Sequence, residues 1–466
     1  MSLSSGVTIN VIVPCGALGL GVKESDIFDA LARGAHAIAC DAGSTDSGPA
    51  YLATAKCKYS RDSIKHDLSI LMRAQAKAGI PLLIGSCGTS GCDEALEWTA
   101  EIAQEIAREH GLHPRIALLQ SEQSPTGMAA LARAGRIQPL APMQDAAPEL
   151  FEACEHIVAL MGPEPYIAAL QAGADIVLGG RTTDTAVLAA VPLMMGAGLG
   201  AAWHAGKIAE CGSLCTELPR EGGVLIRVGR DDFTVEPLGS HNRCTVTTVS
   251  SHMLYENSDP FVLFEPGGYL DATGARYEAV DDRVVRVSGA CFVKQPYTMK
   301  LEGARGGGFQ TMMLVGIEDR DVLADVDHFL THMHQVLVER VQQNMGKRAG
   351  DYDISLRPYG WNAVSGIPPA PNASLPREIG LMFVATAQSQ DIATQIAKTC
   401  NPWFFHLPVK VGQELPSYAF PFSPAEVEIG QVFEFMLNHV VQVDDPQALV
   451  RTVWLQADSN LGVLND

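Results

Sequence analysis

Apolar positions in the first half of the chain follow two alternating periods. Short runs of β-branched and aliphatic residues each end in glycine or a small polar residue, and a stretch of helical period follows. One such stretch places Trp98, Ile102 and Ile106 on a single helix face. The pattern predicts strands at Val7–Val13, Ala35–Cys40, Leu82–Gly85, Arg115–Leu119, His156–Met161 and Asp175–Gly179, with a weaker one at Arg136–Leu140.

Strands that alternate with helices predict a parallel sheet joined by right-handed crossovers. Six or seven strand–helix units between residues 7 and 216 fit an open, doubly wound α/β sheet. A TIM-like barrel built from the same units is the alternative that the sequence leaves open. We therefore expect an N-terminal parallel βα domain over residues 1–220.

The pattern changes after Glu221. Short strands separated by glycine and polar turns precede a helix over residues 320–343, and a strand–helix pair follows over residues 379–400. A Pro-rich loop covers residues 365–379, a strand is expected over 426–443, and the chain after Trp454 is expected to fray. This texture predicts a C-terminal α+β domain over residues 221–466, with subunit contacts as one interpretation of its role.

Composition narrows the class of protein. Of 466 residues, 47% are hydrophobic and 18% are charged, which is typical of a globular chain. The formal net charge of −20 disfavours nonspecific binding to nucleic acid or to an anionic membrane. The eleven cysteines form no CxxC pair, and the N-terminus has no secretory signal, so we expect reduced thiols and a cytoplasmic protein.

Candidate chemistry gathers in the loops that follow the predicted strands. In parallel α/β folds, ligands bind at the carboxyl ends of the strands. Five of the six loops contain glycine, and nearly all carry small hydroxyl or acidic side chains, although such residues also serve as ordinary turns and helix caps. The candidate substrate-binding residues are Ser44 and Thr45 in one loop, Gly85, Ser86, Gly88 and Thr89 in another, and Arg181 and Thr182 in a third.

The glycine-rich loop Gly85–Gly91 resembles a cradle for a phosphate or carboxylate group. It lacks the lysine of a P-loop, which argues against hydrolysis of nucleotide triphosphates. Glycines 16, 19 and 21 have the wrong spacing for a dinucleotide fingerprint. No nucleotide motif is therefore recognised.

Three acidic residues are candidates for general acid or base. Asp46 and Asp184 follow predicted strands, and Asp184 could act as a general base. Arg181, three residues before Asp184, could hold a substrate carboxylate. Glu210 lies between apolar residues, where burial would raise its pKa. The alternative interpretations are an Asp–Arg pair that caps a helix and a surface glutamate at a helix end.

Metal ligands are not evident from spacing. The chain has no HExxH motif and no His/Cys cluster at zinc spacing, and it has no GxSxG nucleophile elbow. A divalent ion held by Asp and Glu from several loops stays compatible with the sequence, so the cofactor is left open.

Several longer segments carry a family resemblance. The segments GADIVLGGRTTDTAVLAA, HAGKIAECG, YENSDPFVLFEPGGYLDATGARYE, TMKLEGARGGGFQ, SLRPYGWNAVSG and EIGLMFVATAQSQDIATQIA together resemble the acyclic terpene utilisation (AtuA-type) family from about residue 170 onward. The N-terminal loops, such as ACDAGSTDSGPAYL, resemble a divergent branch of it. The positions within these segments that the resemblance favours are Arg181, Asp184, Glu210, Cys211, Gly212, Asn257, Asp259, Pro260 and Arg357.

The resemblance implies a catabolic gene context, in which branched terpenoid acids or other organic acids are used. Together with the loops, it favours a hydro-lyase (hydratase) or a related carbon-acid lyase acting on a small carboxylate or an acyl-CoA ester. Asp46, Asp184 and Glu210 would transfer protons, Arg181 would bind the carboxylate, and the Gly85–Gly91 amides would form the anion cradle. A homo-oligomer is the expected state. The alternatives are a subunit that needs a small partner chain for activity, and a ligand-binding protein without catalysis.

Overall fold

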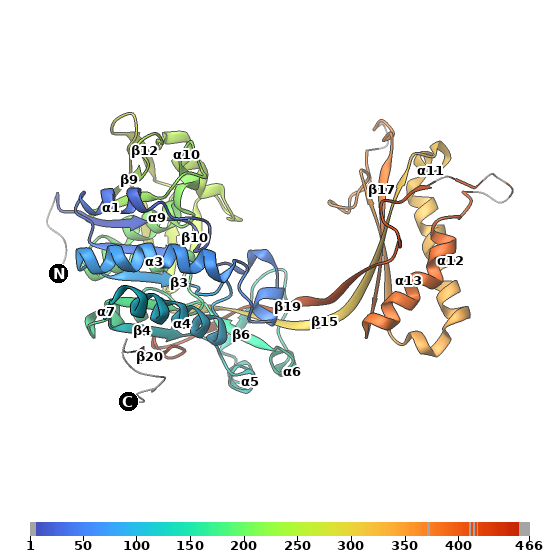
Figure 1. Cartoon of the computed structure of the whole chain (residues 1–466), viewed down its shortest axis with the longest axis horizontal. Coiled ribbons are helices and arrows are strands. Elements are labelled where there is room, and N and C mark those ends of the chain that lie inside the picture. Colours follow the sequence, from blue (N-terminus) through green and yellow to red (C-terminus); the bar gives the residue numbers. More distant parts are fainter. Residues whose placement is uncertain (1–5, 371–372, 410–411, 413–414, 417, 456–466) are drawn as a thin grey trace. The chain divides into compact units, whose positions relative to one another are not determined.

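The computed structural model describes residues 6–370, 373–409, 412, 415–416 and 418–455. The chain forms two compact units, one of Met1–Arg305 with Phe435–Asp466 and the other of Gly306–Glu434 (Figure 1). The expected fraying after Trp454 is wrong for Leu455, which pairs with Ile116 in a strand, and the rest of that segment lies outside the described residues, as do residues 371–372 of the Pro-rich loop. The expected boundary at residue 220 corresponds to neither unit limit, because strands on both sides of it pair in one sheet.

A ten-stranded sheet organises the first unit. Its centre is five parallel strands in the order β1 (Ile9–Val13), β2 (Ala37–Asp41), β3 (Leu82–Gly85), β7 (Ile176–Gly179) and β4 (Ile116–Gln120). Antiparallel strands extend both sides of this centre, so the sheet is open and is not a barrel. They are β8 (Val224–Val228), β9 (Asp232–Pro237), β13 (Val285–Ser288) and β12 (Arg276–Ala279) beyond β1, and β20 (Arg451–Leu455) beyond β4.

Helices cover both faces of this sheet, which confirms the α/β class. Alternate residues of β1 point to opposite cores: Val11 and Val13 pack in one hydrophobic cluster and Ile12 packs in the other. The cluster around Ile12 includes α1 (Glu24–Leu31), α3 (Arg61–Ala78) and α4 (Asp93–His110), and the other includes α7 (Glu164–Gln171), α8 (Asp184–Met194) and α9 (Leu199–Ala209).

The predicted strands at His156 and Arg136 form, but outside this sheet. They become β6 (His156–Ala159) and β5 (Ile137–Pro139), which pair with β15 (Thr298–Ile317) and β19 (Val427–Gln442) respectively. A separate three-stranded sheet is formed by β10 (Val262–Glu265), β11 (Gly268–Asp271) and β14 (Cys291–Lys294). The smaller helices of the unit are α2 (Ala50–Ala53), α5 (Pro125–Arg133), α6 (Pro148–Glu152) and α10 (Val246–Ser251).

The second unit is an antiparallel sheet covered by helices. β17 (Ile379–Ala387) lies between β16 (Tyr352–Tyr359) and residues 309–317 of β15, whose end also pairs with β18 (Tyr418–Ala419). The helices α11 (Arg320–Ala324), α12 (Val326–Asn344) and α13 (Gln390–Phe404) pack on it around Phe329, Phe383 and Phe404. The chain enters this unit along β15 and leaves it along β19.

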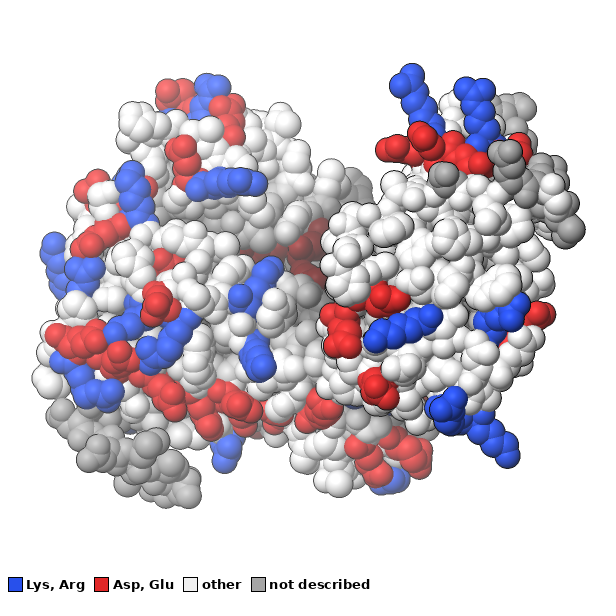
Figure 2. Space-filling view, turned by 45° about the vertical axis from the view of Figure 1, so that its right-hand side comes forward, with Lys and Arg blue, Asp and Glu red and all other residues white. Residues whose placement is uncertain are grey.

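Charged side chains of both signs are interspersed on the face that Figure 2 shows. Among the ion pairs of the first unit, Arg61 pairs with Glu105, with 2.6 Å between Nη2 and the carboxylate. No described helix is both long and apolar enough to cross a membrane.

Close backbone approach fixes the loop between β3 and α4. Gly91 has a φ of 67°, and a Cβ there would lie 2.3 Å from the amide nitrogen of Arg181. The Arg181 amide also donates to the Gly91 carbonyl, with an N···O distance of 3.0 Å. Only glycine allows both the backbone conformation and the contact.

We expect Gly91→Ala to lower the free energy of unfolding by roughly 2–4 kcal/mol, the sum of left-handed strain and a forced shift of backbone. Gly111→Ala is the matched control, because Gly111 has a φ of 61° with no atom within 4 Å of a Cβ, and it should lose about 1 kcal/mol. Chemical denaturation of both variants measures the difference. Equal losses would show that the contact with Arg181 contributes nothing.

Candidate functional site

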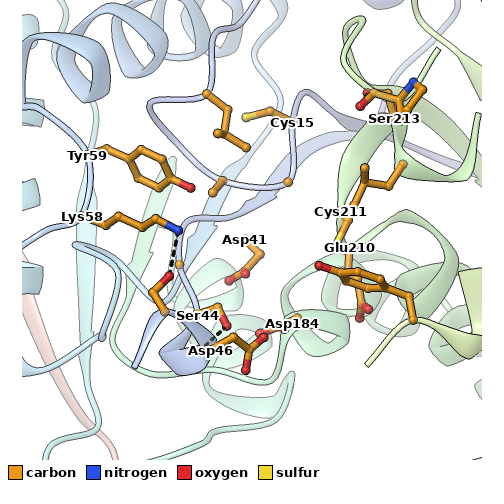
Figure 3. Close-up of a pocket in the computed structure, with 18 of the residues that line it drawn as sticks. Cys15, Asp41, Ser44, Asp46, Lys58, Tyr59, Asp184, Glu210, Cys211 and Ser213 are labelled. Atoms are coloured by element: carbon orange, nitrogen blue, oxygen red, sulfur yellow. Dashed lines mark hydrogen bonds between the residues drawn. The ribbon is translucent and has the colours of Figure 1, made fainter. Parts of the chain in front are cut away.

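A cavity of about 500 Å³ opens in the first unit where the parallel strands end. Asp41 is the last residue of β2, and the loop that follows brings Ser44 and Asp46 to the cavity wall. Asp184 starts α8 after β7, and Glu210 follows the end of α9. Lys58 and Tyr59 lie on one side of the cavity and Glu210 and Cys211 lie on the opposite side, with Asp41 and Asp184 between them (Figure 3).

A second cavity of about 660 Å³ adjoins the first. The two share Ser44, Asp46, Asp184, Glu210 and Glu256. The second cavity combines further charged groups with an apolar wall. The charged additions are Arg181, Lys207, Glu265, Lys300 and Glu302, and the apolar wall includes Leu140, Leu160, Leu263, Phe264 and Val440. We call the two adjoining cavities together the acidic pocket.

Arg181 is a buried cation held by ion pairs. Its Nε lies 3.0 Å from Oε2 of Glu302, and its Nη1 lies 3.3 Å from Oδ1 of Asp184. Burial alone would raise the pKa of Glu302, but Arg181 and Lys300 hold it at about 2. Glu302 is therefore ionised at neutral pH.

Asp184 lies between opposing influences. Burial raises the pKa of its carboxyl, and Arg181 opposes that rise by favouring the charged form. Its side chain keeps 29% of its surface exposed, whereas that of Arg181 keeps only 6%. Asp184 is thus a carboxylate with a cation behind it and a solvent-accessible side.

Glu265 is buried, and no cation within the described part of the chain makes hydrogen-bond contact with it. Thr185 Oγ1 donates to its Oε1, and its Oε2 has no hydrogen-bond partner among the described residues. Burial raises the pKa of Glu265 to about 7, despite the hydrogen bond from Thr185. A carboxyl with such a pKa is half protonated near neutral pH, so it can donate a proton there.

Glu210 contacts the ammonium group of Lys207, which also donates to the carbonyl of Tyr255 at 3.0 Å. Burial raises the pKa of Glu210, and Lys207 opposes that effect. The buried Nε2 of His252 lies 4.0 Å from Glu210 Oε1. Burial and the nearby Lys207 lower the pKa of His252 to about 4, so this imidazole is neutral.

Asp41 is a further buried carboxyl, with an exposed fraction of 4%. Its Oδ1 has no hydrogen-bond partner among the described residues. Burial, and then the negative charge of Asp184, raise the pKa of Asp41 well above its usual range. The acidic pocket therefore combines a carboxyl group whose pKa burial raises, Asp41, with one whose pKa nearby cations lower, Glu302.

Backbone strain also concentrates here. Thr89 and Glu256 have φ angles of 80° and 56°, and both line the first cavity. Ser86, with a φ of 46°, lies behind it and accepts a hydrogen bond from Arg181 Nη1 at 3.1 Å. Non-glycine residues in this conformation cost about 1–3 kcal/mol each and cluster at functional sites.

The structure brings some of the predicted site residues together. Asp46, Asp184 and Glu210 line both cavities, as does Ser44, while Thr89 lines the first and Arg181 the second. The other predicted binding residues are not among those that line either cavity; they are Thr45, Gly85, Ser86, Gly88 and Thr182.

The predicted anion cradle already uses most of its amides. The amide groups of Ser86, Cys87, Ser90 and Gly91 donate to main-chain carbonyls. Lys58 and Arg220, at the first cavity, are cations that have no carboxylate partner among the described residues. They are better placed than the cradle amides to meet an incoming anion.

Among the positions favoured by the resemblance, Cys211 and Asn257 also line a cavity. Asp259 instead caps its own turn by accepting from the amides of Phe261 and Val262, and Arg357 lies on β16 of the second unit. Sequence reasoning missed Glu265, Glu302 and Lys207. The signal available in the sequence was a charged residue within an otherwise apolar predicted strand, as at Glu265 and Glu302.

Two groups within the described residues have the donor types of a metal site. In each, one ligand atom per residue lies within 4.8 Å of the others. The first is Glu210, Cys211 and His252, where the ammonium group of Lys207 already neutralises the carboxylate. The second is Cys92, Glu122 and His156, which lies outside both cavities.

Comparison with family models gives one match. The model described as acyclic terpene utilisation family protein AtuA matches residues 27–222 and 229–424, so the similarity includes the N-terminal loops. Comparisons with curated proteins and with solved structures found no match.

Proposed function

This chain belongs to the acyclic terpene utilisation (AtuA) family, which implies a role in the use of acyclic terpenes, and we propose that it is an enzyme that adds water to, or eliminates water from, a branched organic acid or its CoA ester. The observation that carries the proposal is the pairing of unlike carboxyl groups in the acidic pocket. Asp184 has a cation behind it that favours the charged form, and Glu265 has none in contact. Such a difference assigns a base and an acid.

In the eliminating direction, the carboxylate of Asp184 would accept the proton next to the substrate carbonyl. Glu265 would donate its proton to the departing hydroxyl group, so that a C–H and a C–O bond break, a C=C bond forms and water leaves. The reverse sequence adds water to the double bond. Lys207 and Lys300 line the same cavity and would stabilise negative charge on the carbonyl oxygen.

The lining of the second cavity supports a substrate with an apolar chain. Leu160, Leu263 and Val440 offer an apolar wall beside the carboxyl groups. Each methylene group buried there contributes about 0.8 kcal/mol of binding free energy. Lys58 and Arg220 would hold the carboxylate or phosphate groups of the substrate.

The proposal is tested in the eliminating direction by assaying purified chain against branched acyclic β-hydroxy acids and their CoA thioesters, following formation of the conjugated double bond. We expect activity to fall as the pH rises above about 7, because Glu265 then loses the proton that it must donate. Glu265→Gln should lower kcat by about 10²-fold and remove that alkaline decline. Ligand-induced thermal stabilisation without turnover would favour a non-catalytic binding protein, and turnover only after addition of a second chain would favour a complex.

A stability measurement examines Glu265 without any substrate. Its pKa rises from 4.5 to about 7 on folding, so the stabilising proton is fully held below pH 4.5 and is lost as the pH rises through 7. Relative to Glu265→Gln, the wild-type chain should lose about 3 kcal/mol over this interval. Urea denaturation at several pH values measures the difference. Parallel stability curves for the two proteins would show that Glu265 is ionised throughout.

A further inference from the structure

A second cluster of reactive side chains lies away from the acidic pocket. Cys92 immediately precedes α4, Glu122 follows β4, and His156 begins β6. One donor atom from each lies within 4.8 Å of the other two. Three separate segments of the first unit thus bring a thiol, a carboxylate and an imidazole to one point.

Hydrogen bonds orient these donors. His156 Nδ1 lies 2.6 Å from Glu122 Oε1, and the amide of Asp93 donates to Glu122 Oε2 at 2.7 Å. Ser90 Oγ donates to Cys92 Sγ at 3.3 Å. The sulfur is buried, whereas the side chains of Glu122 and His156 keep 21% and 22% of their surface exposed, so an ion can reach the cluster from solvent.

A further carboxyl group lies next to the cluster in the sequence. Asp93 follows Cys92 directly, and its buried Oδ1 has no hydrogen-bond partner among the described residues. Arg451 lies beside this carboxylate, with 3.8 Å between Arg451 Nη2 and Asp93 Oδ2. A buried carboxylate oxygen without a hydrogen-bond partner is a group that a nearby cation would stabilise.

We propose that Cys92, Glu122 and His156 bind one divalent metal ion of the zinc type, with Asp93 or water completing the coordination. Thiolate, imidazole and carboxylate are the ligands that zinc takes in proteins, in tetrahedral geometry. The ion would replace the proton that now bridges His156 and Glu122. Zinc–ligand distances of about 2.0–2.3 Å place tetrahedral ligand atoms roughly 3.3–3.8 Å apart, so side-chain shifts of about 1 Å close the site.

The ion would fasten the loop that borders the acidic pocket. Thr89 lines the first cavity, and three residues later the same loop reaches Cys92. Fixing Cys92 to Glu122 and His156 would hold the loop at the end distant from the pocket. This role is structural and does not depend on the reaction that we propose for the pocket.

The test uses the full-length chain after removal of metal with a chelator. Titration with Co²⁺ should give a thiolate-to-cobalt charge-transfer band that saturates at about one ion per chain and disappears when Zn²⁺ is added. Cys92→Ser should abolish the band. Cys211→Ser makes the same change in the other candidate group and should leave the band intact.

His156→Asn and Glu122→Gln keep the thiol and provide a second test if Cys92→Ser fails to fold. Each substitution should weaken Co²⁺ binding by at least about 10-fold. Circular dichroism and a cooperative thermal transition verify that each variant is folded. The proposal is overturned if the wild-type chain gives no charge-transfer band. It is also overturned if the band disappears in Cys211→Ser and persists in Cys92→Ser, or if both histidine and glutamate variants bind Co²⁺ as tightly as the wild type.

Discussion

Asp184→Asn is expected to lower kcat by about 10³–10⁴-fold, the largest effect that we anticipate on the proposed reaction. The amide keeps the size of the side chain and its place at the start of α8, but it accepts no proton. Its partner Arg181 stays tied to Glu302 at 3.0 Å, so the fold should change little. Turnover of the hydroxy acid or thioester in the eliminating direction, measured with the substrate in excess, gives kcat directly.

The matched control for this prediction is Asp259→Asn. Asp259 belongs to a segment that resembles the family, but it is exposed and caps its own turn, and an asparagine oxygen can still accept those hydrogen bonds. Its activity should stay within about twofold of the wild type. If Asp184→Asn behaved like this control, Asp184 would not be the base, and Asp46 or Glu210 would take its place as the first candidate.

Arg181→Ala is expected to reduce the free energy of unfolding by about 3–5 kcal/mol, the largest expected effect on stability. Removal of the guanidinium leaves the buried carboxylate of Glu302 with Lys300 as its remaining ion-pair partner. The Glu302 pKa of about 2 shows how strongly its charged form depends on these cations. Denaturant unfolding of both proteins at pH 7 measures the loss.

Two further variants distinguish the stability cost of breaking this buried ion pair from that of breaking an exposed one. Arg61→Ala breaks an exposed pair with Glu105 and should cost no more than about 1 kcal/mol. Arg181→Ala combined with Glu302→Gln should recover part of the lost stability, because no unpaired charge is then buried. A double variant as unstable as the sum of its two single changes would mean that the pair is not coupled.

The pH dependence of the same pair has a defined sign. Because folding lowers the pKa of Glu302 from 4.5 to about 2, its contribution to stability is complete above pH 4.5 and is lost as the pH falls toward 2. The difference in stability between wild type and Arg181→Ala should therefore narrow over that interval.

The strands and helices of the first unit were predictable because their patterns are local. The run at Ala35–Cys40 becomes β2, and the helical stripe at Trp98, Ile102 and Ile106 becomes α4. The expected strand at His156 also forms, but periodicity does not specify its partner. It pairs with β15, more than a hundred residues later, rather than with the parallel strands.

The acidic pocket was predictable only in part for the same reason. Asp46 and Asp184 follow strands, and the rule that parallel strands present their carboxyl ends at one edge is sufficient to locate them. Glu265 and Glu302 come from β10 and β15, whose packing against that edge depends on long-range contacts. The role of Arg181 depends on Glu302, so its ion pair could not be foreseen from its own loop.

The order of elements along the chain has a consequence for synthesis on the ribosome. β4 acquires its outer neighbour only when β20 emerges, after the entire second unit has been translated. Val440 and Gln442 of the second cavity also arrive at this late stage. A nascent chain therefore exposes an unpaired strand edge and an incomplete pocket for some 300 residues of elongation, which makes it a candidate for chaperone binding, and a truncated product lacking β20 would be prone to aggregate.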